Sequence, residues 1–152
     1  MKHLFTIIAP LLIFSTAFIP QEKSINEGIK FHTSSWEEVQ ELASKEGKPI
    51  FIDLYASWCG VCRSLKEKTF SDAKAAEFFN TNYINYAVDG ESKEGKKLLE
   101  KYILTDEEDP RMKFRQYPQL LILDQAGNLV QKHNGFLSAE ELIELGNIKN
   151  SH

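Results

Sequence analysis

Residues 49–70 of this 152-residue chain read PIFIDLYASWCGVCRSLKEKTF and contain its only two cysteines, Cys59 and Cys62. Residues 49–56 are apolar on both faces apart from Asp53, which predicts a central β-strand covered on both sides. Residues 63–68 are good helix formers, so a helix should begin at the cysteine pair. The two thiols are therefore expected where a buried strand ends and a helix starts.

The position of Cys59 at the start of a helix predicts an acidic thiol. The first helical turn presents unpaired N–H groups and a partial positive charge, which favour an anion over its neutral acid. A free cysteine titrates near about 8.5, and one in this position can fall to about 7 or lower. Cys62 should be the less exposed, resolving thiol. Cys59 would attack a substrate disulfide, and Cys62 would then break the mixed disulfide.

Three other interpretations of the cysteine pair are open. A structural disulfide that closes about four residues would restrict the unfolded chain by only about 2 kcal/mol. A closed zinc site needs four ligands, but no second cysteine pair exists and the four histidines lack ligand spacing. Two inert core thiols are the third possibility. We expect a redox-active pair with no metal and no other cofactor.

Residues 51–63, FIDLYASWCGVCR, resemble the active-site segment of the thioredoxin superfamily. The continuation TFSD at 69–72 is similar to the C-terminal periplasmic domain of the bacterial transmembrane thiol-disulfide reductase and to small exported thioredoxin-like proteins. The resemblance covers about residues 30 to 149. It implies an α/β thioredoxin fold, with a central mixed sheet of four to five strands flanked by helices on both faces, and thiol-disulfide oxidoreductase activity on protein disulfides.

The remaining elements are predicted from caps, apolar periods and turns. They are a short first strand at 29–31, helices that start in the capping boxes 35–38 and 138–141, a strand at 83–88 parallel to the central one, a helix at 91–102, and an antiparallel hairpin of 120–124 with 129–133.

Residues 1–17 predict an export signal. A basic start is followed by an apolar run at 4–19, which is shorter than the about 20 residues of a membrane span, and Ser15-Thr16-Ala17 offers small residues for cleavage. An uncleaved membrane anchor is the alternative. In both cases the folded part should be periplasmic or secreted, with 18–28 as a flexible leader and 29–150 as one thioredoxin-like domain.

The composition excludes some classes of partner. With a net charge of -4, the chain is a poor candidate for binding nucleic acid or anionic lipid. Membrane contact is expected only if the N-terminal segment stays uncleaved. The resemblance implies a disulfide-containing client protein and an upstream electron-donor protein as partners, and we expect a monomer.

The resemblance assigns substrate binding to five positions. Pro118 matches the family's cis-proline, which lies opposite the cysteine pair and shapes a groove. Tyr117, just before it, would present main-chain hydrogen bonds to an extended substrate segment, a form of strand addition. Trp58, Gly60 and Val61 would complete the same binding surface. Outside these five, Gly135 matches a glycine near the family's active site.

Asp53 is the candidate proton acceptor. A lone carboxylate in a doubly covered strand is costly when ionised, so burial should raise its pKa and suit it to proton transfer. In the family the matching aspartate helps to deprotonate the second cysteine through water. The alternative is an aspartate with a structural role only, whose hydrogen bonds are all satisfied within the fold. Thioredoxins often place a lysine near this aspartate, and the corresponding strand here offers Asn85 instead.

Residues 103–114 depart from the family pattern as an insertion of about ten residues, acidic and turn-like at 105–110 and then basic. One interpretation is a solvated surface loop. The other is a segment that borders the substrate groove and selects partners, because it immediately precedes Tyr117.

The direction of electron flow is argued from the two residues between the cysteines. Strong oxidants of the superfamily often carry a histidine there, whereas this chain has Gly60 and Val61. Thioredoxin lies near about -270 mV and the oxidant DsbA near about -120 mV. The missing histidine favours a reductase. A disulfide oxidase or isomerase, or a non-catalytic redox-sensing module that binds clients, are the alternatives.

Overall fold

The computed structural model describes residues 28–103 and 117–147. Within them the chain forms four strands and five helices. The strands are β1 (Ile50–Tyr55), β2 (Ile84–Asp89), β3 (Gln119–Leu123) and β4 (Leu129–Asn134). The helices are α1 (Trp36–Glu46), α2 (Gly60–Lys68), α3 (Ala73–Asn82), α4 (Lys93–Tyr102) and α6 (Ala139–Gly146).

The four strands form one mixed sheet in the order β2-β1-β3-β4. Strand β1 is parallel to β2, because α2 and α3 cross over between them, and antiparallel to β3. Strands β3 and β4 form the predicted antiparallel hairpin. In the register of the sheet, Asp53 lies between Ala87 of β2 and Leu120 of β3. This places one carboxyl group in the middle of the sheet.

Two helices begin at the predicted capping boxes, and a third begins at an aspartate cap. Ser35 and Ser138 each form a capping box, with Glu38 and Glu141 respectively, at the starts of α1 and α6. Asp72 caps α3 by accepting hydrogen bonds from two backbone N–H groups of its first turn. Local sequence therefore determines where these three helices begin.

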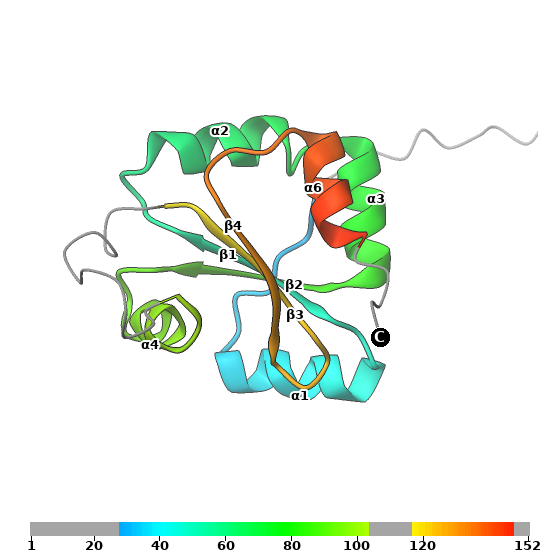
Figure 1. The fold of residues 1–152 in the computed structure, drawn as a ribbon, viewed down its shortest axis with the longest axis vertical. Helices are drawn as coiled ribbons and strands as arrows, with labels where there is room; N and C mark the ends of the chain where they lie inside the picture. Colours follow the sequence, from blue (N-terminus) through cyan, green and yellow to red (C-terminus); the bar gives the residue numbers. More distant parts are fainter. Residues whose placement is uncertain (1–27, 104–116, 148–152) are drawn as a thin grey trace, which may run out of the picture.

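The helices enclose the sheet in three layers (Figure 1). Helices α1 and α4 cover one face, and α2, α3 and α6 cover the other. We call these the α1/α4 face and the α2/α3/α6 face. Alternate residues of β1 point to opposite faces, so Ile50, Ile52 and Leu54 pack on the first while Phe51 packs on the second. The predicted α/β architecture is confirmed, with four strands in the described residues.

The strand predicted at 29–31 is wrong. Residues 29–31 pair with no strand, and the next residue, His32, makes an isolated parallel bridge with Tyr86. The polar backbone groups of this segment bind side-chain amides instead: Asn80 accepts from the Lys30 N–H, and Asn85 donates to the Lys30 carbonyl over 3.4 Å. The Ile29 N–H donates to the Phe70 carbonyl over 2.7 Å, so this bond too leads away from the sheet.

Most of the insertion predicted at 103–114 lies outside the described residues, as do the export signal and most of the leader. Helix α4 ends at Tyr102, and the described chain resumes at Tyr117, directly before Pro118. Of the helices in the described part of the chain, none is both long and apolar enough to cross a bilayer.

Candidate active site

The two cysteines lie at the junction of β1 with α2. Cys59 is the N-cap residue of α2 and forms a disulfide with Cys62, with their Cα atoms 5.3 Å apart. The backbone N–H of Cys62 donates a hydrogen bond to the Cys59 sulfur over 3.0 Å. The first helical turn thus places an N–H donor and the partial positive charge of the helix N-terminus next to this sulfur, as predicted from the sequence.

The expected difference in exposure between the two cysteines is not present in the disulfide form. Cys59 is 6% exposed and Cys62 is 8% exposed, so both are buried and Cys62 is not the more protected residue. Both pack against Ala56, and the rings of Tyr55 and Tyr117 lie against this small cluster. The sequence prediction failed because one of the covering side chains, Tyr117, comes from a distant part of the chain.

Pro118 lies beside the disulfide. The Tyr117–Pro118 peptide bond is cis, and the Tyr117 carbonyl oxygen lies 3.6 Å from the Cys59 sulfur. The Pro118 carbonyl accepts hydrogen bonds from the Gly135 N–H and from the Asn134 side chain, both over 3.1 Å. Strand β3 therefore starts with its proline against the cysteine pair, and β4 secures that start.

The Tyr117 ring is held between two other residues of the site. It makes an edge-to-face contact with Trp58, with ring centroids 5.9 Å apart. On its other side it packs so closely on Gly90 that a Cβ atom there would overlap the ring. The Gly90 N–H in turn donates to the Tyr55 carbonyl over 2.8 Å. Gly90, which the sequence analysis did not single out, thus helps to position Tyr117.

Large exposed apolar side chains are found close to the cysteines in the chain. Trp58 is 58% exposed and Val61 is 44% exposed, and they precede and follow Cys59. Phe136, which we did not predict, is also exposed and follows Gly135, the residue bonded to Pro118. Gly60 has open space where a Cβ would be, so close packing does not require a glycine there. These exposed apolar side chains are available for contact with another molecule.

Asp53 is buried on the α2/α3/α6 face of the sheet. The residue is only 7% exposed, and its Oδ1 atom has no hydrogen-bond partner in the structure. Burial raises the pKa of this carboxyl from 3.8 to about 7, and the positive charge of Lys66 partly opposes the increase. The sequence prediction of a raised pKa is confirmed. A carboxyl that titrates near neutral pH can accept or give up a proton under physiological conditions.

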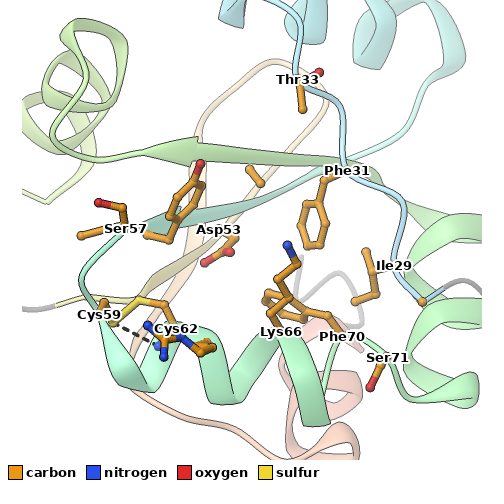
Figure 2. Close-up of a pocket in the computed structure, with 15 residues that line it drawn as sticks. Ile29, Phe31, Thr33, Asp53, Ser57, Cys59, Cys62, Lys66, Phe70 and Ser71 are labelled. Carbon is orange, nitrogen blue, oxygen red and sulfur yellow. Dashed lines mark hydrogen bonds between the residues drawn. A yellow bond between two sulfur atoms is a disulfide. The ribbon is translucent and has the colours of Figure 1, made fainter.

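A cavity of about 510 Å³ connects Asp53 to the disulfide (Figure 2). Both cysteines and Asp53 line it, and its far end is apolar, formed by Ile29, Phe31 and Phe70. Water needs only about 15 Å³ of free space. The cavity, which both Asp53 and Cys62 line, therefore has room for water.

Two cations of α2, Arg63 and Lys66, line this cavity, and the charge of Lys66 lowers the pKa of Asp53. Lys66 was not predicted from the sequence. The expected substitute for the family's lysine, Asn85, instead binds Lys30 and Asn80, at the end of β2 away from Asp53. Lys66 lines the cavity from α2, one helical turn after Cys62. The i, i+4 spacing of Cys62 and Lys66 was the signal that could have found it.

Metal binding has no support in this part of the chain. Within residues 28–103 and 117–147, no three His, Cys, Asp or Glu side chains are grouped so that they could hold a metal ion. Among the groups of this site, the two sulfurs and Asp53 are the ones that disulfide exchange can use.

Comparison with known sequences identifies related proteins. A family model described as a thioredoxin-like domain matches residues 36–147. The thiol:disulfide interchange protein DsbD of Yersinia pestis (strain Pestoides F) is 30% identical over 106 residues, which make up 68% of this chain and 16% of that protein. DsbD of Photorhabdus laumondii subsp. laumondii is 27% identical over 115 residues, 73% of this chain and 18% of that protein. The chain thus spans less than a fifth of these curated relatives.

Solved structures with the same fold agree with this family assignment. A Bacteroides thetaiotaomicron protein assigned as a disulphide-isomerase has a TM-score of 0.63 and 32% identity, with 77% of this chain and 88% of that chain covered. The oxidised C-terminal domain of Neisseria meningitidis DsbD has a TM-score of 0.56 and 22% identity, with 76% and 94% covered, and supports the fold alone. Because the family model covers most of the described residues, including the cysteine pair and Pro118, the chain belongs to the thioredoxin-like family.

Proposed function

We propose that this protein is an exported thiol-disulfide oxidoreductase that reduces disulfides of client proteins. The observation that carries the proposal is the cysteine pair itself: a disulfide at the N-terminus of α2, with an N–H group directed at the Cys59 sulfur and the Tyr117–Pro118 segment beside it. A stabilised thiolate next to a second thiol is what two-step disulfide exchange requires.

The first step is attack by Cys59 in the reduced protein. Its thiolate attacks one sulfur of the client disulfide, a Cys59–client bond forms, and the client S–S bond breaks with release of a client thiolate. The Cys62 N–H and the start of α2 stabilise the Cys59 thiolate before the attack.

The second step is resolution by Cys62. Its thiol passes a proton to Asp53 through the cavity, and the resulting thiolate attacks the Cys59 sulfur. The Cys59–Cys62 disulfide forms, and the client leaves with its second sulfur as a thiolate. Two electrons have then moved from the dithiol to the client, and an upstream electron-donor protein must reduce the pair again.

The client is proposed to bind across the surface around Pro118. Trp58, Val61 and Phe136 offer apolar contacts there, and the Tyr117 backbone is positioned next to the reactive sulfur. An extended client segment that pairs with this backbone would place its disulfide at Cys59. The undescribed insertion before Tyr117 is proposed to contribute to the choice of client.

The proposed compartment rests on the N-terminal pattern of the sequence. The basic start and short apolar run of residues 1–17 support export to the periplasm or the exterior, where disulfides persist. If this segment is retained, the domain would be tethered to a membrane.

A second candidate function is disulfide isomerisation, favoured by the Bacteroides thetaiotaomicron protein assigned as a disulphide-isomerase. The midpoint potential of the Cys59–Cys62 pair separates the two. A potential below about -220 mV supports the reductase. A potential near that of protein disulfide isomerase, about -180 mV, supports the second candidate.

The decisive experiment is repeated reduction of a protein disulfide such as insulin, with dithiothreitol as electron source. The wild-type protein should turn over many times, Cys59→Ser should lose the activity completely, and Cys62→Ser should accumulate a mixed disulfide with the substrate. Equal, uncatalysed rates for wild type and Cys59→Ser would show that the domain is a binding or sensing module.

A further inference from the structure

We propose that Lys66 is the positioning residue through which this chain controls the proton affinity of Asp53, from the helix that carries the cysteines. The proposal rests on the proposed function and extends it, because it identifies how the proton acceptor for Cys62 is adjusted.

The walls of the cavity determine which charges can act on Asp53. Its neighbours across the sheet, Ala87 on β2 and Leu120 on β3, are apolar, and the segment at 28–33 contributes apolar and hydroxyl side chains. The titratable or charged groups that line the cavity are Asp53 itself, Tyr55, Cys59, Cys62, Arg63 and Lys66. Any cation that acts on Asp53 from the cavity walls must therefore come from α2.

Of the two α2 cations on the cavity wall, Arg63 and Lys66, it is Lys66 whose charge acts on Asp53. Figure 2 shows its side chain extending from α2 toward the sheet, past Phe70, with the nitrogen on the side of the cavity where Asp53 lies. A long apolar stem can lie along an apolar wall while its charged end remains in contact with water. Among the described residues the two groups form no direct salt bridge, so the interaction acts through the space of the cavity.

The sign of the effect follows from the charges. The Lys66 charge lowers the pKa of Asp53, against the larger increase caused by burial. Without Lys66, a smaller fraction of Asp53 would be ionised at neutral pH. Fewer molecules could then accept the Cys62 proton, and resolution of the mixed disulfide would slow.

The size of the effect is limited by solvent. Lys66 is exposed as a whole residue, so water and salt screen part of its charge. Interactions of partly exposed charges are typically worth 0.2 to 1 kcal/mol, which corresponds to about 0.2 to 0.7 pH unit. Removal of the charge should therefore raise the titration midpoint of Asp53 by about this amount.

The test is an NMR titration of the Asp53 side-chain carboxyl carbon in the oxidised full chain. The cysteines do not titrate in the disulfide, so the midpoint reports on Asp53 alone. The variants are Lys66→Met, which keeps the stem, Lys66→Arg, which restores the charge, and Lys68→Met, which removes an exposed charge from the same helix but not from the cavity.

We expect the midpoint to rise by about 0.2 to 0.7 unit in Lys66→Met and to stay near the wild-type value in Lys66→Arg and Lys68→Met. Added salt should raise the wild-type midpoint and leave that of Lys66→Met nearly unchanged. An unchanged midpoint in Lys66→Met, or equal shifts in Lys66→Met and Lys68→Met, would overturn the proposal.

A kinetic measurement connects the titration to exchange. The rate of mixed-disulfide resolution in Lys66→Met should show the same midpoint shift and be about 1.5- to five-fold lower at pH 6, the fold-change equivalent to that shift. If no variant resolves a mixed disulfide, the proposed function fails, but the titration still decides the role of Lys66. If all variants resolve it with one pH profile, the function stands and the role of Lys66 is refuted.

Discussion

The two faces of the sheet are built differently. The α1/α4 face is filled by apolar side chains, among them Ile50, Ile52 and Leu123, with no exposure to solvent. The α2/α3/α6 face has a comparable apolar core around Phe51, but next to it lie Asp53, the disulfide and the cavity. One strand, β1, supplies both faces through alternate residues.

This difference separates stability from chemistry. The α1/α4 face stabilises the domain mainly by burial of apolar side chains. Its buried Tyr86 stays neutral near neutral pH, because burial and the Glu94 carboxylate raise the pKa of that hydroxyl, so this contribution should change little with pH. The other face contains a carboxyl group without a full set of hydrogen bonds, which costs stability whenever the group is ionised. Each prediction below changes one face and leaves the other intact.

The largest expected effect is on the stability of Asp53→Asn. Because the pKa of Asp53 is raised from 3.8 to about 7, the folded wild type should lose stability as the pH rises from about 4 to above 7. The shift corresponds to about 4 kcal/mol. The asparagine variant should lack this dependence, so its stability relative to wild type should increase from pH 4 to pH 8.

Urea unfolding of the oxidised proteins across this range measures the effect, and parallel stability curves for the two proteins would contradict it. In exchange assays, Asp53→Asn should also slow release of the mixed disulfide while leaving the first attack by Cys59 largely intact. A variant that gains stability at high pH and loses resolution would assign both properties to one carboxyl group.

The next effect concerns the packed face. Leu123→Ala removes a side chain with no exposed surface at the end of β3 far from Pro118, and it should cost about 3 kcal/mol. The loss of stability should be equal at pH 5 and pH 8. The rate of disulfide reduction, measured where the variant is fully folded, should be unchanged. A pH-dependent loss, or a lower rate in fully folded protein, would show that the two faces are coupled.

The smallest effect is expected at the helix caps. Ser35→Ala at the start of α1 and Ser138→Ala at the start of α6 should each cost about 1 kcal/mol, and threonine at either position should restore most of it. The two caps belong to opposite faces. Markedly different costs in thermal unfolding would mean that the faces also differ in how their helices are anchored.

Features governed by neighbouring residues could be predicted from the sequence. Capping at Ser35 and Ser138, the parallel order of β1 and β2, and the helix that starts at Cys59 depend on local patterns and connection rules, and the structure agrees with them. The strand at 29–31 was wrong because its backbone groups are bonded by amides of Asn80 and Asn85, which no local pattern reveals.

The site was predicted in part for the same reason. Cys59, Cys62 and Asp53 stand within ten residues of one another, so their proximity and the raised pKa of Asp53 followed from one strand and one helix start. The burial of Cys59 was missed because Tyr117, 58 residues later, covers it. Lys66 was missed because its approach to Asp53 depends on how α2 packs over β1, which sequence spacing alone does not reveal.

Short-range periodicity and capping were enough to predict the order of elements, the helix start at the cysteine pair and the carboxyl group on the central strand. The surroundings of these groups depend on packing of the whole domain: Tyr117 on the Cys59 sulfur, the cavity beside Asp53 and the charge of Lys66 at its wall. Burial and electrostatic fields arise from groups that are brought together by packing, and packing is a property of the whole fold.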